Sequence, residues 1–206
     1  MSKLMAISRM RTGTDGKGLT TLVGFYGCPL RCRYCLNEDC HTREIDERTE
    51  HSPEELLERV KLDDIYFRMS GGGVTFGGGE PLLQAEFLAR FAQLAPKTWK
   101  LRIETSLNVP WEAVERMLPY ADQWIVDVKD MNPDIYKAYT GVENAMVIEN
   151  LRRLYEGAGG DKLHLRIPRI PGYNQAADIE NSLKELKGYQ CKKEVFDYIV
   201  SEKTER

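Results

Sequence analysis

The sequence predicts an α/β domain built on a parallel β-sheet. Six apolar runs rich in β-branched and aromatic residues alternate with segments whose apolar residues recur at helical spacing. This alternation implies right-handed strand–helix–strand units, whose strands pair in parallel. With 206 residues the chain has room for one domain with a substantial core, and we expect residues 1–206 to form that single domain.

The apolar runs give the expected strands, and the segments between them give the helices. Ser52 is the expected N-cap of the first helix, with Pro53 in its first turn and Glu55 completing a capping box. The expected strands are Leu19–Tyr26, Gly73–Phe76, Leu101–Thr105, Trp124–Val128, Leu163–Ile170 and Val195–Val200. The expected helices are Pro53–Met69, Leu82–Ala95, Trp111–Tyr120, a short one opened by Asn132-Pro133, Ala145–Tyr155 and Ala176–Lys187.

Six parallel strands are compatible with a partial barrel and with a doubly wound sheet, and periodicity does not separate the two. In both architectures, ligands bind at the carboxyl ends of the strands. The residues that follow each strand are therefore the first candidates for a functional site.

Composition and charge exclude several classes of function. The net charge is −3 and no lysine- or arginine-rich run is present, so nucleic-acid binding has little electrostatic support. The segment from Met1 to Arg11 has no apolar core of a signal peptide, and no stretch approaches about 18 consecutive apolar residues. We therefore expect a cytoplasmic protein that binds no membrane.

The cysteines favour metal ligation. Three of the five lie within eight residues, directly after the first expected strand, at Cys28, Cys32 and Cys35. Thiolates are soft ligands that suit iron–sulfur clusters or zinc, and three of them would leave one iron of a four-iron cluster open. The alternative is a structural zinc site that adds Cys40 or His41 as the fourth ligand. Spacing favours the cluster, because only Cys32 and Cys35 have the spacing of a zinc-binding pair.

Polar residues at the ends of later strands are further candidates. Gly77-Gly78-Gly79 follows the second strand, where the absence of side chains lets a ligand approach the backbone. Asp127 and Lys129 lie two residues apart at the end of the fourth strand, so alternation places them on the same face. The other histidines and cysteines, Cys40 and His41 among them, are expected to be structural or exposed.

The cysteine spacing, with Tyr34 before the last cysteine, is similar to the signature of the radical S-adenosylmethionine (SAM) superfamily. Further segments resemble the activating enzyme of pyruvate formate-lyase, over roughly residues 13–186. These segments are Asp15–Gly18, Ser70–Phe87, Glu104-Thr105-Ser106, Asp127-Val128-Lys129 with Met131-Asn132, and Arg166 followed by Pro171-Gly172.

The resemblance implies a fold, cofactors and roles for individual residues. It implies a partial (β/α)6 barrel with parallel strands, a 4Fe-4S cluster on the three cysteines of the loop, and SAM bound at its open iron. A Na⁺ or K⁺ ion would be held by Glu104, Thr105 and Asp127. The residues expected to bind SAM are Tyr34, Gly78, Gly79, Glu80, Asp127, Lys129 and Arg166.

The implied reaction is activation of a glycyl radical enzyme. Reductive cleavage of SAM gives a 5′-deoxyadenosyl radical, which takes a hydrogen atom from a glycine of a partner such as pyruvate formate-lyase or a relative. Flavodoxin or ferredoxin is the implied electron donor, and we expect a monomer. The alternatives are a radical SAM enzyme for a small molecule, in deazapurine or cofactor biosynthesis, and a non-catalytic zinc module.

The sequence departs from the family pattern in two places. Lys17 and Leu36 stand where the family has proline and often histidine. The chain is also expected to be a short form that stops after the sixth strand, where the family continues with a histidine-bearing loop that helps to hold SAM. Without a second cysteine-rich insert, it resembles the single-cluster type of activating enzyme.

Overall fold

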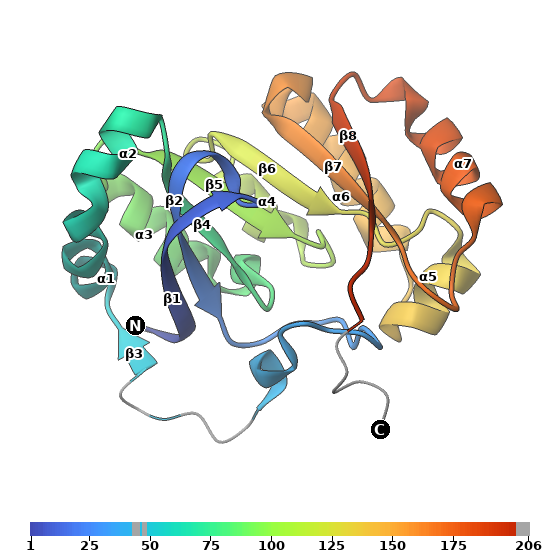
Figure 1. Cartoon of the computed structure of the whole chain (residues 1–206), viewed down its shortest axis with the longest axis horizontal. Helices are drawn as coiled ribbons and strands as arrows, with labels where there is room; N and C mark the ends of the chain where they lie inside the picture. The colour runs from blue at the N-terminus through green and yellow to red at the C-terminus, as the bar shows by residue number, and fades with distance from the viewer. Residues whose placement is uncertain (43–45, 47–48, 201–206) are drawn as a thin grey trace.

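The computed structural model describes residues 1–42, 46 and 49–200. Within them the chain forms one eight-stranded sheet with the order β3-β1-β2-β4-β5-β6-β7-β8, flanked by helices (Figure 1). The strands are β1 (Ser2–Gly13), β2 (Gly16–Phe25), β3 (Glu50–His51), β4 (Gly73–Gly78), β5 (Lys100–Thr105), β6 (Gln123–Asp127), β7 (Leu163–Arg169) and β8 (Lys192–Asp197).

Six strands, β2, β4, β5, β6, β7 and β8, pair in parallel, as the strand–helix alternation predicts. Neighbouring helices pack in the order α1, α3, α4, α6 along the outside of the sheet. The helices are α1 (Pro53–Val60), α2 (Asp64–Ser70), α3 (Ala85–Leu94), α4 (Trp111–Met117), α5 (Pro133–Thr140), α6 (Ala145–Ala158) and α7 (Ala176–Glu185). The predicted parallel α/β fold is therefore confirmed.

The two faces of the parallel strands differ in chemistry. The face toward the helices is apolar, with Trp124 and Val126 of β6 in the main core. The opposite face carries Asp127 of β6, with Arg166 paired beside it on β7. A sheet buried on one side by helices normally leaves polar groups where its other side meets water or a ligand. The polar face therefore marks the side on which a ligand would bind.

Strand β1 was not predicted from the sequence. It pairs antiparallel with β2, and with the short strand β3 it forms one edge of the sheet. Lys3, Arg9 and Arg11 interrupt its apolar residues, and Arg9 lies half exposed, so an apolar run did not reveal it. The hairpin with β2 supplies the pairing that defines this strand.

Two boundaries also differ from the prediction. The expected helix Pro53–Met69 is interrupted by a 3-10 turn at Lys61–Asp63, because the buried Asp63 carboxylate accepts hydrogen bonds from Arg9 (3.0 Å) and Thr21 (2.6 Å). The last strand is Lys192–Asp197 rather than Val195–Val200, since the backbone pairs with β7 through three charged residues at its start. The predicted capping box of Ser52 and Glu55 is confirmed.

Among the described residues, none of the helices has both the length and the hydropathy needed to cross a bilayer. Residues 201–206, on which the expectation of a shortened C-terminus partly depends, lie outside the described part of the chain.

Candidate functional site

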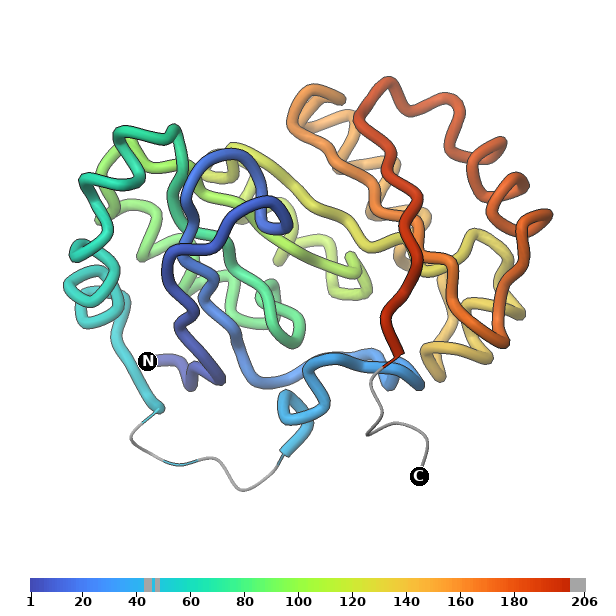
Figure 2. Tube along the Cα trace, in the orientation of Figure 1, coloured from blue at the N-terminus to red at the C-terminus, as the bar shows by residue number. Residues whose placement is uncertain are grey.

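The cysteine loop (residues 27–41) follows β2 and crosses the carboxyl ends of the strands toward the end of β8 (Figure 2). Its two ends are tied together by a hydrogen bond from the Gly27 N–H to the Cys40 carbonyl (2.7 Å). A second bond, from the Arg31 N–H to the Thr140 carbonyl (2.8 Å), fixes the loop to the end of α5. Its three predicted cluster ligands are half-buried free thiols that line one cavity, namely Cys28, Cys32 and Cys35.

The thiols of the loop differ in how readily they lose a proton. A hydrogen bond from Cys40 lowers the pKa of Cys35 to about 6, against the opposing effect of burial. Burial raises the pKa of Cys32 to about 11, although Lys129 lies close enough to oppose it. A metal ligand must be a thiolate, so binding of iron here would release the proton of Cys32.

The glycines after β4 are required by the chain itself. A Cβ atom on Gly79 would lie 2.2 Å from the Gly27 carbonyl oxygen, and one on Gly78 would lie 2.8 Å from the backbone of Gly24. The Gly79 and Glu80 N–H groups donate to the carbonyls of Phe25 and Gly27. The end of β4 is therefore docked against the start of the cysteine loop, which only glycine permits.

The segment Ser70–Gly73 packs against the start of β2. The Leu19 N–H donates to the Ser70 hydroxyl (2.8 Å), and a Cβ on Gly72 would collide with the Leu19 carbonyl at 1.8 Å. Two segments that carry the family resemblance thus support each other at the far ends of their strands.

Glu80 joins the end of β4 to the end of β5. Its carboxylate is 1% exposed and accepts hydrogen bonds from the Thr105 hydroxyl (2.8 Å) and from the N–H and hydroxyl of Ser106 (2.9 and 2.7 Å). Burial raises the pKa of Glu80 despite these donors. Because both oxygens are engaged, Glu80 positions the loop after β4. The sequence did not reveal Ser106 as its partner.

A charge network lies at the ends of β5, β6 and β7. Asp127 accepts hydrogen bonds from Lys129 (2.9 Å) and Arg166 (2.7 Å), and Arg166 also reaches Glu104 (3.3 Å). Burial alone would raise the pKa of Asp127, but the two cations hold it well below its usual range. Burial raises the pKa of Glu104 to about 7, because Arg166 offsets it only in part. Asp127 and Lys129 lie on the same side of the sheet, as predicted, and both line the same cavity.

These elements surround one cavity of about 400 Å³. The thiols, the glycine turn and the charge network all contribute to its lining. Of the residues predicted for the site, the cavity is lined by Cys28, Cys32, Cys35, Gly78, Gly79, Glu80, Glu104, Thr105, Asp127, Lys129 and Arg166.

Tyr34 lies apart from this cavity lining. Its ring packs against those of Tyr139 (6.1 Å between centroids) and Tyr173 (5.7 Å), which fixes the cysteine loop against α5 and the segment after β7. The structure thus gives Tyr34 a packing contact.

The three residues predicted for a monovalent cation already have protein partners. The Thr105 hydroxyl bonds to Glu80 and to the Leu107 N–H, and both oxygens of Asp127 accept from cationic side chains. The Na⁺ or K⁺ site therefore stays a prediction.

Cys40 was expected to be structural or exposed, without ligand neighbours. The structure corrects the second part of that expectation. Cys40 is buried, its thiol hydrogen-bonds to the sulfurs of Cys28 and Cys35, and it lies beside His41. The spacing alone did not reveal this contact, because it depends on how the 3-10 turn Glu38–His41 folds back on the loop.

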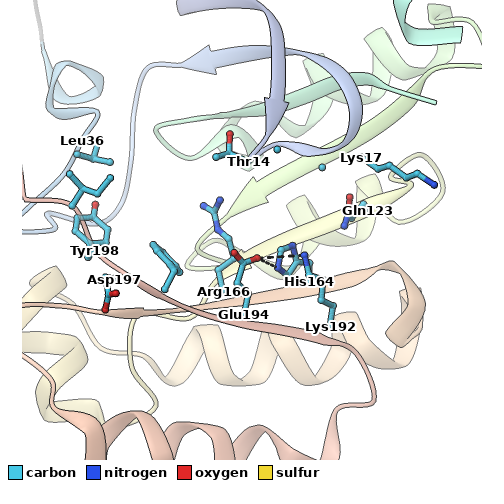
Figure 3. Close-up of a pocket in the computed structure, with 14 residues that line it drawn as sticks. Thr14, Lys17, Leu36, Gln123, His164, Arg166, Lys192, Glu194, Asp197 and Tyr198 are labelled. Atoms are coloured by element: carbon cyan, nitrogen blue, oxygen red, sulfur yellow. Dashed lines mark ion pairs between the residues drawn. The ribbon is translucent and has the colours of Figure 1, made fainter. Parts of the chain in front are cut away.

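A second cavity of about 550 Å³ adjoins the first between the β1–β2 turn and β8 (Figure 3). Lys17, Lys192 and Asp197 line it together with apolar side chains such as Ile199. His164 lies within it, 2.7 Å from Glu194. The residues common to both cavities are Thr14, Leu36, Arg166, Phe196 and Tyr198.

The donor set of the first cavity suits an iron–sulfur cluster and a zwitterionic ligand. Three soft thiols with an odd ligand count favour a cluster that keeps one open iron. Beside them, Lys129 and Arg166 can meet a carboxylate, Arg166 with the planar fork that suits it. The residues present therefore fit a 4Fe-4S cluster with SAM.

Comparison with known proteins places this geometry in a family. Residues 22–186 match the model of the radical SAM superfamily. The chain is 33% identical to the (2S)-3-sulfopropanediol dehydratase activating enzyme of Klebsiella oxytoca, over 84% of this chain and 75% of that protein. It is 38% identical to the pyruvate formate-lyase-activating enzyme of Clostridium pasteurianum, over 68% of this chain and 58% of that one.

A solved structure agrees with these relatives. A domain of the pyruvate formate-lyase-activating enzyme from Bacteroides vulgatus superposes with a TM-score of 0.54 and 27% identity, covering 65% of this chain and 88% of that one. The chain therefore belongs to the radical SAM superfamily and, within it, to the activating enzymes of glycyl radical enzymes. Enzymes of this family use a 4Fe-4S cluster and SAM and act on a protein substrate.

Proposed function

We propose that this chain activates pyruvate formate-lyase or a closely related glycyl radical enzyme by generating a radical on one of its glycines. The observation that carries the proposal is the convergence of three thiols, a glycine turn and a buried charge network on one cavity. The similarity to a pyruvate formate-lyase-activating enzyme supports the choice of partner. A partner of the dehydratase type, as for the relative from Klebsiella oxytoca, is the alternative.

In this proposal each group has a distinct role. Cys28, Cys32 and Cys35 hold the cluster, and Lys129 and Arg166 bind the carboxylate of SAM. Asp127 keeps the two cations in place, because it hydrogen-bonds both of them. The backbone of Gly78 and Gly79 would meet the methionyl amine. Glu104, Thr105 and Asp127 would hold the monovalent cation, and Glu80 keeps the loop after β4 in position.

When bound, the reduced cluster and SAM together would supply a carbon-centred radical that takes hydrogen from a glycine α-carbon. The chain's own task is to hold these groups and keep water and oxygen away from them. Lys129, whose side chain is 9% exposed, is buried enough for its charge to act strongly on a ligand carboxylate.

The glycine of the partner would reach the site through the second cavity. This cavity shares Arg166 and Tyr198 with the first, so a segment lying in it would face the bound SAM. Its lining combines lysines, acids and aromatic rings, which suits a peptide segment better than a small apolar molecule. We further propose flavodoxin or ferredoxin as the electron donor, a monomeric chain acting in the cytoplasm, and residues 1–206 as one domain.

The decisive experiment is electron paramagnetic resonance of the reconstituted, reduced chain under anaerobic conditions. We expect a reduced four-iron signal that changes shape when SAM is added, and a glycine-centred radical when pyruvate formate-lyase is added as well. The variant Cys191→Ala should give the same signals as the wild type, because this free thiol lies on a different part of the chain, before β8.

Each failure has a separate meaning. A cluster that does not respond to SAM would contradict the proposed SAM site. A SAM response without a glycine radical on pyruvate formate-lyase, but with one on a dehydratase-type partner, would replace the proposed partner and keep the reaction. A colourless protein that never holds iron would overturn the proposal as a whole.

A further inference from the structure

A second set of possible metal donors lies within the cysteine loop. The sulfurs of Cys35 and Cys40 and a ring nitrogen of His41 all lie within 4.8 Å of one another. The Cys40 thiol also hydrogen-bonds to the sulfur of Cys28. We propose that the chain without its iron–sulfur cluster binds one zinc ion through Cys35, Cys40 and His41, with Cys28 as the fourth ligand.

The donor atoms are close to the spacing that zinc requires. Zinc–sulfur bonds of about 2.3 Å and zinc–nitrogen bonds of about 2.0–2.1 Å place the ligand atoms of a tetrahedral site roughly 3.5–3.8 Å apart. The ligand atoms of Cys35, Cys40 and His41, which lie within 4.8 Å of one another, would have to move about 1 Å closer, and Cys28 joins them through its contact with Cys40. Three cysteines and one histidine form a common ligand set of structural zinc sites.

The local fold holds these donors in place without a metal. The 3-10 turn Glu38–His41 brings Cys40 back over the loop, and the Cys40 N–H donates to the Asn37 carbonyl (2.9 Å). The hydrogen bond from Gly27 to the Cys40 carbonyl then fixes this turn beside Cys28. A lone buried cysteine is usually a small apolar residue. Convergence of Cys40 with three further donors is what indicates a site.

Cys28, Cys40 and His41, three of the four proposed zinc ligands, can be reached from a side other than the first cavity, which is proposed to bind SAM (the SAM cavity). A separate cavity of about 490 Å³ is lined by Cys28, Arg31, Cys40 and His41. Cys32 and Cys35 line the SAM cavity instead, and Cys28 lines both. Arg31 supplies a positive charge near His41, which helps to balance three thiolates around one divalent ion.

The zinc site and the cluster site share ligands, so only one of them can be filled. Cys28 and Cys35 belong to both sets, Cys32 belongs only to the cluster set, and Cys40 and His41 belong only to the zinc set. Zinc would hold the cluster-free loop in a folded state and block cluster assembly until it is removed. The competition rests on the cluster site proposed above, whereas zinc binding by itself does not.

Zinc binding is tested first on the full chain freed of its cluster under anaerobic conditions. Zinc affinity is measured by competition with a chromophoric chelator, and cobalt(II) is added separately as a spectroscopic probe. We expect one equivalent of zinc and the ligand-field bands of tetrahedral cobalt. Cys40→Ala and His41→Ala should each weaken zinc binding by at least about tenfold, while Cys32→Ala and Cys191→Ala leave it within about twofold.

Three outcomes would overturn the inference. One is the absence of stoichiometric zinc binding. Another is equal weakening by Cys32→Ala and Cys40→Ala, which would put zinc on the predicted cluster ligands. The third is unchanged binding in Cys40→Ala and His41→Ala.

Competition is tested by loading zinc before reconstitution with iron and sulfide. The wild-type chain should then assemble cluster much more slowly than without zinc, whereas the Cys40→Ala/His41→Ala double variant should assemble it at the zinc-free rate. Equal inhibition in both would overturn the competition. A zinc-free wild-type chain that holds a cluster but gives no glycine radical would count against the proposed function and leave the zinc site standing.

Discussion

Two carboxylates that follow β4 and end β6, one buried and one partly exposed, illustrate two ways to hold a charge in this protein. Glu80, after β4, is surrounded by hydroxyl and N–H donors and its pKa is raised. Asp127, at the end of β6, is held by Lys129 and Arg166 and its pKa is lowered. Glu80, with neutral donors around it, links the ends of β4 and β5. Asp127, with charged partners, holds Lys129 and Arg166 where an anionic ligand could bind them. Position at a strand end therefore does not by itself give a residue its role.

The largest effect should come from Asp127→Asn. This change removes the carboxylate that hydrogen-bonds both Lys129 and Arg166, and it leaves Arg166 with Glu104 and Glu194 as counter-charges. Removing one partner of a buried ion pair typically costs about 3–5 kcal/mol, and we expect the lower end of that range because the Asp127 side chain is 23% exposed. Urea unfolding of the cluster-free chain would measure the loss.

The matched control for Asp127→Asn is Glu149→Gln. Glu149 is 55% exposed and pairs with Arg152 on the surface, so its loss should change stability by less than about 0.5 kcal/mol. The double variant Asp127→Asn/Lys129→Met should recover part of the lost stability. A loss below about 1 kcal/mol in Asp127→Asn would contradict the view that this carboxylate balances buried cations.

The second largest effect should come from Gly79→Ala, which disturbs the packing of the turn before Glu80 against the cysteine loop. The new methyl group would lie 2.2 Å from the Gly27 carbonyl oxygen, so the backbone of either β4 or the cysteine loop must move. Overpacking of this kind costs about 1–3 kcal/mol, and we also expect a lower iron content after reconstitution. Gly188→Ala is the control, because its methyl group would meet no atom within 4 Å. Equal stability and equal iron content in the two variants would refute the proposed docking.

Glu80→Gln should have a smaller effect than Asp127→Asn, although both replace a carboxylate by its amide. The glutamine keeps one acceptor oxygen but turns its amide group toward donors such as those of Ser106. Leaving one or two neutral donors unsatisfied costs about 1–2 kcal/mol. A larger loss of stability in Glu80→Gln than in Asp127→Asn, measured by thermal or urea unfolding, would contradict this ranking.

Much of this site could be predicted because its residues follow apolar strands. Asp127 ends β6 and pairs in parallel register with Arg166 of β7, so the alternation of the strands places both side chains on one face of the sheet. The partners that come from tertiary contacts could not be predicted. Ser106 meets Glu80 because the loops after β4 and β5 pack together, and Cys40 meets Cys28 because the cysteine loop folds back on itself.

The same distinction applies to the fold. The parallel strands are apolar and predictable, but β1 contains charged residues and is defined by its pairing with β2. The break in the first helix was hidden as well, because it depends on Asp63 meeting Arg9 of β1. The hydrophobic pattern of the sequence therefore predicts strands and helices that are themselves apolar. It does not predict features, such as β1 and the break at Asp63, that depend on contacts with another element.

The smallest effect concerns His164, on the polar face of β7. Its titration tests whether burial or the neighbouring Glu194 determines the direction of its pKa shift. Glu194 lies 2.7 Å away and favours the protonated form, yet burial and Lys192 outweigh it and lower the pKa of His164. The unfolded chain therefore binds more protons than the folded chain between the folded pKa and about 6.5. The contribution of His164 to stability should fall as the pH decreases through this window, by at most about 1.4 kcal/mol per pH unit, and should be level above it.

His164→Asn isolates this contribution from other titrating groups. Subtracting the pH profile of its urea unfolding from that of the wild type should leave a curve that rises with pH up to about 6.5. Glu194→Gln should widen the window toward lower pH, because it removes the group that favours protonation. A difference curve that falls with rising pH would mean that Glu194 raises the pKa of His164 above its unfolded value. His164 would then be held by a charge as Asp127 is, rather than dominated by burial as Glu80 is.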